Sequence, residues 1–461
     1  MPTKIIGKES PMASIHSNLY IHPLDRSALA ALKAIPGFTP LLKAYMKALS
    51  EQQFRIENMA THLRVSEKQL PEYYHMLLPI CAKLGIEVPE LYLKLDGSPN
   101  AYTSGDTRPF IVLTSGLIEK FPAELIPAVL AHECGHIACH HVLYHTMGSI
   151  LLSTAASALG LSDLFTFPLQ SAFAHWMRCS ELSADRAAAI ALDARDVVEY
   201  CIRFAGYPAN AAHKPNQEAF MAQAQEYRAM MHESAWNKIL ELLMYSQADH
   251  PINAVRAYEC YTWAQSEEYQ NITRYYRSSQ EQSLIPADVL CPLAEDGSSY
   301  VHRDSQQLQM ELRSLGFHHV ELKRSTTPDS RFHIGQTKAL RINGASQLPA
   351  ASWYPADAKV EIEYYEPLTD AEIVAMHPGQ VRTPMSSRQA LGSNYIQVIQ
   401  ALKEAGFTAF VIQEQRDSTR GWFTTDKEVV RISIDGHEVF EAGTWFQEDD
   451  VVRILYRVLP N

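Results

Sequence analysis

Residues 123–144 read AELIPAVLAHECGHIACHHVLY and contain the motif from which the rest of the chain can be interpreted. Apolar residues recur in this stretch at helical spacing, so it predicts one long helix. His132, Glu133 and His136 form an H-E-x-x-H pattern on that helix. Four residues turn a helix by about 400°, which brings both imidazoles onto one face, where they suit a zinc ion. The neighbouring Glu133 carboxylate can serve as the proton acceptor in metal-assisted hydrolysis.

A catalytic zinc takes three protein ligands and keeps a fourth position open. Glu181 follows His136 by 45 residues in an Ala-rich helical stretch, and Asp185 follows one turn later. The two carboxylates share one helix face, so Glu181 can complete the ligand set while Asp185 steadies a ligand histidine. The alternative is that both are solvated helix carboxylates, and the upstream H-E-x-x-H favours the metal site.

Other histidines offer rival metal pairs. His136 and His140 stand four residues apart, as do His141 and His145. Neither pair has a glutamate directly after its first histidine. Neither therefore supplies a base together with the ligands, and we favour the H-E-x-x-H pair.

Six motifs follow one another within residues 20–265: Asn100-Ala101, Thr114-Ser-Gly-Leu117, Glu124-Leu125, the H-E-x-x-H, Arg178-Cys-Ser-Glu181 with Asp185, and His250-Pro251 with Arg256. In this order they resemble the gluzincin peptidases that include HtpX and the CAAX prenyl proteases, metallopeptidase family 48. The resemblance implies zinc endopeptidase activity. It implies His132, His136 and Glu181 as zinc ligands and Glu133 as the general base.

The same resemblance implies which residues surround the metal. It puts His250 and Arg256 close by, where we expect them to face the oxyanion of the tetrahedral intermediate. The alternative for these two is a helix N-cap region with a surface arginine. The resemblance also places an extended substrate along the strand that contains Asn100, Ala101 and Tyr102, as an added β-strand.

Composition narrows the class of protein. The chain has 461 residues, a net charge of −12, 46% hydrophobic and 20% charged residues, which is typical of a globular protein. The acidic balance argues against a nucleic-acid partner. Seven cysteines without a C-x-x-C pair do not form a disulfide framework, so we expect a reducing compartment and a cytoplasmic location.

No membrane-spanning segment is expected from the sequence. The N-terminus has no apolar signal region. The longest stretch without charge or histidine, Thr146–Ser162, is shorter than the ~20 residues of a bilayer span, so it predicts a buried core helix. Proteins of the HtpX type carry transmembrane helices beside the site, and we therefore expect this chain to fall in the soluble branch of the family.

The last third of the chain contains an internal repeat, with an offset of 90 residues in its first half and 92 in its second. The first half matches Leu308, Leu312, Gly316-Phe317 and Val320 with Val398, Leu402, Gly406-Phe407 and Phe410. The second half matches Ile342-Asn-Gly344 with Ile434-Asp-Gly436, Trp353 with Trp445, and Val360-x-Ile-x-Tyr364 with Val452-x-Ile-x-Tyr456. Each copy predicts a helix closed by Gly-Phe and followed by alternating strands. The copies distantly resemble PASTA-type repeats.

The predicted fold is α+β: a mainly helical H-E-x-x-H zinc-metallopeptidase domain with a small sheet, followed by two small α+β repeats. The expected boundaries are a helical segment at 1–70, the catalytic domain at 71–275, a linker at 276–300, the first repeat at 301–367, a linker at 368–393 and the second repeat at 394–461.

The predicted function is that of an endopeptidase with one Zn²⁺ per chain, acting on peptides or unfolded proteins, with the repeats as modules for a protein partner. One alternative is an inactive metal-binding scaffold that acts through its repeats. The other is a chaperone-like protein that holds extended peptides. Glu133 argues against both alternatives, because a site without catalysis needs no base.

Overall fold

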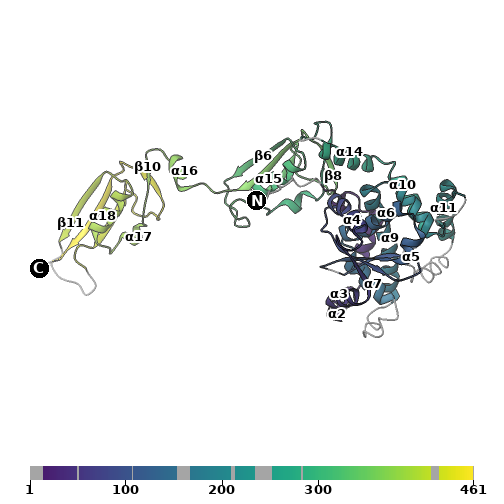
Figure 1. Ribbon diagram of the computed structural model, residues 1–461. Coiled ribbons are helices and arrows are strands. Elements are labelled where there is room, and N and C mark those ends of the chain that lie inside the picture. Colours follow the sequence, from purple (N-terminus) through teal and green to yellow (C-terminus); the bar gives the residue numbers. More distant parts are fainter. Residues whose placement is uncertain are drawn as a thin grey trace, which may run out of the picture. The chain divides into compact units, whose positions relative to one another are not determined.

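The computed structural model describes residues 14–48, 51–105, 107–152, 167–208, 213–233, 252–281, 284–416 and 425–459. The chain divides into two units, Met1–Arg324 with Gly335–Tyr364, and Ser325–Ile334 with Tyr365–Asn461. The first unit contains the H-E-x-x-H helix and the first repeat, and the second unit contains the second repeat (Figure 1). The fold is α+β, as predicted.

Short helices and one strand open the chain: η1 (Ser17–Leu19), α1 (Pro23–Ala34), α2 (Phe38–Ala48), α3 (Glu51–Thr61) and β1 (Leu63–Val65). Helix α1 begins with a proline at its first position, and the His22 ring accepts a hydrogen bond from the Leu24 backbone N–H at 3.1 Å. Asp25 in its first turn is fully buried, which is unusual for a carboxylate and marks a specific contact.

Helix α4 (Pro71–Leu84) and a four-stranded sheet follow, with β2 (Glu90–Lys94), β3 (Ala101–Ser104) and β4 (Phe110–Thr114) in the order β1-β2-β4-β3. Gly85 ends α4 in the left-handed region at φ +69°, as the sequence suggests. The β4 strand is buried along its whole length and pairs antiparallel with β3, which is one of the two edge strands of this sheet. Ala101 and Tyr102 belong to β3, and Asn100 precedes it.

Among the described residues, the rest of the predicted catalytic domain contains the helices α5 (Ser115–Lys120), η2 (Ala123–Leu125), α6 (Ile126–Ala138), α7 (Val142–Leu152), α9 (Phe167–Ala191), α10 (Ala194–Phe204), α11 (Gln217–Glu233), α13 (Asn253–Trp263) and α14 (Glu267–Glu281). Helices α6 and α9 pack closely through small residues. A Cβ atom on Gly135 would lie 2.7 Å from the Cβ of Ala187 and 2.9 Å from the Cα of Ala184. The glycine within the H-E-x-x-H motif therefore sets the distance between the two helices.

The long helical stretch predicted over 123–144 is helical but interrupted, because α6 ends at Ala138 and α7 begins at Val142. His140 lies in the left-handed region at φ +58°. The N–H of His141 bonds to the carbonyl of His136 at 2.9 Å, and the N–H of His140 bonds to that of Ile137 at 3.0 Å. This pair of bonds is the Schellman helix ending, here with histidine where glycine is usual. It folds His141 back toward His136.

The stretch Thr146–Ser162, predicted as a buried core helix, is only partly covered, because residues 153–166 lie outside the described ranges. Its covered part belongs to α7, where Thr146, Met147 and Leu151 are buried as expected. Within the described ranges, no helix combines the length and the apolar character needed to cross a membrane.

The two repeats have the same topology. The first contains β5 (Leu290–Leu293), η4 (Gly297–Tyr300), α15 (Ser305–Ser314), β6 (His319–Ser325), β7 (Thr337–Ile342), β8 (Ser352–Pro355) and β9 (Lys359–Tyr365). After α16 (Asp370–Ala375), the second contains β10 (Gln380–Arg382), α17 (Ser387–Ala390), α18 (Tyr395–Glu404), β11 (Phe410–Arg416), β12 (Val429–Ile434), β13 (Trp445–Gln447) and β14 (Val452–Val458). The strand orders are β5-β8 with β6-β9-β7, and β10-β13 with β11-β14-β12.

Each repeat is longer than the sequence suggests. The expected linker 276–300 contains the end of α14 and strand β5, which pairs with β8. The expected linker 368–393 contains β10, which pairs with β13. Both stretches are rich in turn-forming residues, and their strands are defined by partners about 60 residues away in the chain. Local composition does not report such distant pairing.

The first repeat is not separate from the helical part of its unit. One hydrophobic core contains Leu130 and Ile190 of the helical part together with Leu308 and Ile362 of the first repeat. The second repeat has a core of its own, built around Val398, Phe407 and Ile454. This arrangement differs from the expectation of two modules joined by flexible linkers.

Candidate active site

The predicted metal ligands lie together in the structure. His132 and His136 project from α6 and Glu181 from α9, and all three side chains are buried. The Nε2 atoms of the two imidazoles are 3.2 Å apart. Each Nε2 lies 3.3 Å from one oxygen of the Glu181 carboxylate. The three donor groups therefore converge on one point.

The spacing of these donors fits zinc. Ligand atoms placed tetrahedrally at about 2.0–2.1 Å from zinc are about 3.3 Å from one another, which matches the distances found here. Two imidazole nitrogens and one carboxylate are also a donor set typical of catalytic zinc sites. Burial and the nearby Arg256 oppose protonation of His132, but the carboxylates of Asp185 and Glu181, which accept its hydrogen bonds, outweigh them and raise its pKa. Burial lowers the pKa of His136.

Asp185, which the sequence predicts to steady a ligand histidine, contacts the ring of His132. Its Oδ1 atom is 2.9 Å from Nδ1 of His132, the ring nitrogen that does not face Glu181. The Tyr200 hydroxyl on α10 donates to the same carboxylate and lies 3.2 Å from the same ring nitrogen. Burial opposes ionisation of Asp185, but Arg256 and His132 outweigh it and lower its pKa. An ionised Asp185 fixes a proton on Nδ1 and leaves Nε2 for a metal.

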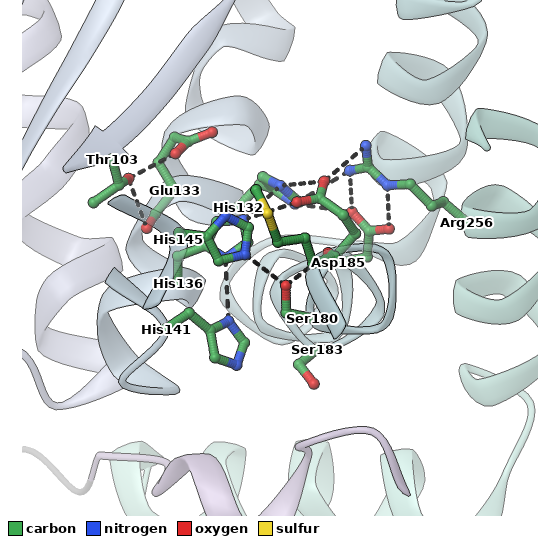
Figure 2. A network of polar contacts seen from close by, with 12 residues as sticks. Thr103, His132, Glu133, His136, His141, His145, Ser180, Ser183, Asp185 and Arg256 are labelled. Atoms are coloured by element: carbon green, nitrogen blue, oxygen red, sulfur yellow. Dashed lines mark hydrogen bonds and ion pairs between the residues drawn. The ribbon is translucent and has the colours of Figure 1, made fainter. Parts of the chain in front are cut away.

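Arg256 lies on α13 with its guanidinium buried among these carboxylates (Figure 2). Its Nε and Nη2 atoms donate to Asp185 at 2.8 and 2.6 Å, and Nη1 lies 3.2 Å from Glu181. The sequence led us to expect Arg256 opposite an oxyanion. The structure instead places it where it holds the two carboxylates that support and complete the ligand set.

Glu133 lies beside the ligands and is 1% exposed. The Thr103 hydroxyl on β3 donates to its Oε2 atom at 2.6 Å (Figure 2). This hydrogen bond connects the candidate base to the strand that carries Ala101 and Tyr102. A substrate paired with β3 would therefore lie near Glu133.

A second group of histidines adjoins the ligands. Donor atoms of His136, His141 and His145 lie within 4.8 Å of one another. Nδ1 of His141 is 3.1 Å from Nδ1 of His136, and Nε2 of His145 is 2.6 Å from the Ser180 hydroxyl. His140 is exposed, so the rival pair His136/His140 is not assembled.

The sequence did not identify every residue of this region. His250 lies outside the described residues, so its predicted role stays a prediction. Thr103 and Tyr200 were not singled out for their contacts with Glu133 and His132. Their hydrogen bonds span 30 and 68 residues of chain, and no short motif marks contacts of that kind.

Comparisons with known proteins identify similar peptidases. Residues 68–259 match the model of Peptidase family M48. The chain is 34% identical over 258 residues to the plastoglobule-localized metallopeptidase 48, chloroplastic, of Arabidopsis thaliana, covering 55% of this chain and 74% of that protein. It is 31% identical over 103 residues to a protease HtpX homolog of Bifidobacterium longum, covering 22% of this chain and 33% of that protein.

Among solved structures, the extracellular region of the Ser/Thr kinase PrkC from Staphylococcus aureus matches 37% of this chain and 48% of that chain, at 12% identity and a TM-score of 0.15. A likeness of that size supports no conclusion about the repeats. The match to the plant metallopeptidase covers about three quarters of that protein, and the family model covers the H-E-x-x-H helix. The chain belongs to peptidase family M48.

Proposed function

We propose that this protein is a zinc-dependent endopeptidase that cleaves peptides or unfolded proteins and binds one zinc ion per chain. The observation that carries the proposal is the convergence of His132, His136 and Glu181 at zinc-like spacing with a buried glutamate, Glu133, beside them. A purely structural zinc site has four protein ligands and needs no base.

Zinc bound at these ligands would supply a Lewis acid that polarises the scissile carbonyl and acidifies water. Glu133 then takes the proton of the attacking water on its carboxylate and passes it to the departing amine. Thr103 donates to Oε2 of Glu133 at 2.6 Å and so orients this carboxylate. Burial of Glu133 keeps the proton transfer away from bulk water.

We propose that the substrate lies extended along β3, next to Asn100, Ala101 and Tyr102. Backbone pairing with this edge strand would bind many sequences, because main-chain groups are common to all peptides. His250 is our candidate for the group that hydrogen-bonds to the oxyanion. Arg256 acts differently, by holding Asp185 and Glu181 in place.

We further propose a cytoplasmic location. All seven cysteines, each within the described ranges, are free and buried. Free cysteines are typical of proteins in a reducing compartment, where disulfides do not form. A protein partner for the second repeat remains part of this proposal, since that repeat forms a unit with its own core.

The test is proteolysis of an unfolded protein such as casein by the full-length chain, with zinc content measured on the same samples. We expect cleavage that a chelator abolishes and zinc restores. Glu133→Gln should keep the metal and lose about 10²–10⁴-fold in rate, because only the proton acceptor is removed.

The matched control is Glu119→Gln, which removes an exposed carboxylate from α5, outside the motifs that define the resemblance. It should cleave at the rate of the original protein. Equal cleavage by Glu133→Gln would show that Glu133 is not the base. Zinc binding without any cleavage would favour the scaffold or peptide-holding alternatives.

A further inference from the structure

A chain of buried polar groups leads from the ligand His136 to the N-terminal helix α1. Nδ1 of His136 faces Nδ1 of His141 at 3.1 Å. Nε2 of His141 lies 2.8 Å from Oδ2 of Asp25. His141 and Asp25 are both 0% exposed, so water cannot substitute for any of these contacts.

Asp25 is surrounded by hydrogen-bond donors. Trp176 Nε1–H donates to Oδ1 at 2.9 Å, and the Ser183 hydroxyl donates to Oδ2 at 2.6 Å. Trp176 and Ser183 lie on α9, the helix that also carries Glu181. An ionised carboxylate can only accept hydrogen bonds, so it suits this environment. The same requirement puts a proton on Nε2 of His141, the ring nitrogen that faces Asp25.

A metal on Nε2 of His136 determines where each proton of this chain lies. The remaining ring proton of His136 must then be on Nδ1, which donates to Nδ1 of His141. His141 in turn carries its own proton on Nε2, the atom that faces Asp25. Every contact then joins one donor to one acceptor. The opposite arrangement would put a proton on Nε2 of His136, at the position of the metal.

We propose that Asp25 and His141 are positioning residues that hold His136 in the tautomer and orientation needed for metal binding, so that helix α1 completes the metal site. The inference rests on the zinc site of the proposed function. Asp25 lies outside residues 68–259, the part matched by the family model. Through His141, Asp25 supports the ring of His136 as Asp185 supports the ring of His132.

The surrounding fold holds both residues in place. The helix ending at His140 turns His141 back over His136. On the other side, the backbone N–H of His22 donates to the Ser183 hydroxyl at 2.9 Å, which anchors the start of α1 on α9. His141 is thus held by the end of α6, and Asp25 is held by the anchored start of α1. The two residues meet in the buried space between α1, α6 and α9.

The first test is Asp25→Asn, which keeps the shape of the side chain and changes one acceptor into a donor. If the amide nitrogen faces His141, it meets the N–H on Nε2 of that ring. If it faces Trp176, it meets an indole N–H that can only donate. Either orientation creates a contact between two donors. We expect the zinc affinity to fall about 10- to 100-fold, the usual effect of losing such a support.

The second test compares two substitutions of His141. The side-chain amide of His141→Gln offers an acceptor toward His136 and a donor toward Asp25, which preserves the direction of the hydrogen bonds. His141→Phe fills the space and offers neither. We expect zinc affinity within about threefold of the original for Gln, and a loss of about 10- to 100-fold for Phe. If Asp25→Asn fails to fold, the comparison of His141→Gln with His141→Phe still tests whether this chain of hydrogen bonds supports zinc binding.

Zinc affinity is measured by competition with a chromophoric chelator on the full-length protein. The matched control is Glu259→Gln, which removes another contact at the start of α1, the 3.6 Å ion pair of Glu259 with His22, without touching the histidine chain. An unchanged affinity for Asp25→Asn and His141→Phe would overturn the proposal. An equal loss in Glu259→Gln would also overturn it, since the effect would then come from anchoring α1.

Cobalt substitution gives a site-specific readout. The Nδ1 protons of His132 and His136 should give two exchangeable, paramagnetically shifted proton signals. Asp25→Asn should speed the exchange of one and leave the other, next to Asp185, unchanged. Equal changes in both signals would contradict the proposal. These measurements need no turnover, so they test the role of Asp25 independently of peptidase activity. If zinc binding depends on Asp25 but the protein cleaves nothing, the proposed function is refuted and the role of Asp25 stands.

Discussion

Replacing Arg256 by Met should destabilise the metal-free first unit by about 3–5 kcal/mol, the usual cost of removing one partner of a buried ion pair. The guanidinium makes contacts of 2.6, 2.8 and 3.2 Å with Asp185 and Glu181, and all three side chains are at most 1% exposed. Methionine has a similar length and no charge. It would leave two buried carboxylates close together without a cation.

The assay is hydrogen exchange with mass spectrometry along a urea series, in the presence of a chelator. Peptides from α9 and α13 report the first unit, and peptides from β11 and β14 report the second. The second unit serves as an internal reference, because Arg256 belongs to the first. Arg256→Lys should fall between the original protein and Arg256→Met, since lysine keeps the charge but not the two-pronged contact.

The control substitution is Arg303→Met. Arg303 contacts Glu311 in the first unit, and these side chains are 37% and 40% exposed. A surface pair of this kind contributes about 0–1 kcal/mol. A loss below about 1 kcal/mol for Arg256→Met, or one no larger than that of Arg303→Met, would refute the electrostatic role that we assign to Arg256.

Four further outcomes are expected. Glu181→Ala should leave the purified protein markedly depleted of zinc by elemental analysis, and full occupancy would exclude Glu181 as a ligand. Gly135→Ala should lower the free energy of unfolding by about 1–3 kcal/mol in urea titration, because the added methyl group would lie 2.7 Å from Ala187. His22 and Arg228 outweigh burial and lower the pKa of Glu259 to about 2, so its stabilising contribution is present above the unfolded pKa of about 4.5 and is lost as the pH falls toward 2. Glu259→Gln should therefore be less stable than the original at pH 7, and the two should converge below pH 4.5 in thermal unfolding. A chain ended after Ser279 should aggregate because it loses part of the core of the first unit, whereas one ended after Tyr365 should stay monomeric by light scattering; the reverse result would show that the first repeat is a separate module.

The parts of the fold that depend on local pattern could be predicted from the sequence. Helix α4 and its glycine ending follow from apolar spacing and from Gly85, and β4 follows from a short β-branched run. The site was predictable for a related reason. The i, i+4 spacing of His132 and His136 places them on one helix face, and only Glu181 had to be brought in from another helix.

The parts that depend on distant contacts could not be predicted. Asp25 and His141 are 116 residues apart in the chain and meet only because α1 packs on α9. The strands β5 and β10 lie in stretches whose composition suggests linkers, and only their pairing partners make them strands. The break after α6 was missed because His140, and not glycine, takes the left-handed position.

The matched tryptophans of the two repeats have different neighbours, so the two copies are under different constraints on sequence change. Trp353 of the first copy packs edge-on against Tyr275 of α14, whereas its counterpart Trp445 stacks on His377 within the second unit. The first copy is thus constrained by the helical part of its unit, and a substitution that shortens Trp353 should disturb the packing against Tyr275. The contact of Trp445 lies within the second unit, so sequence changes around it need not remain compatible with α14.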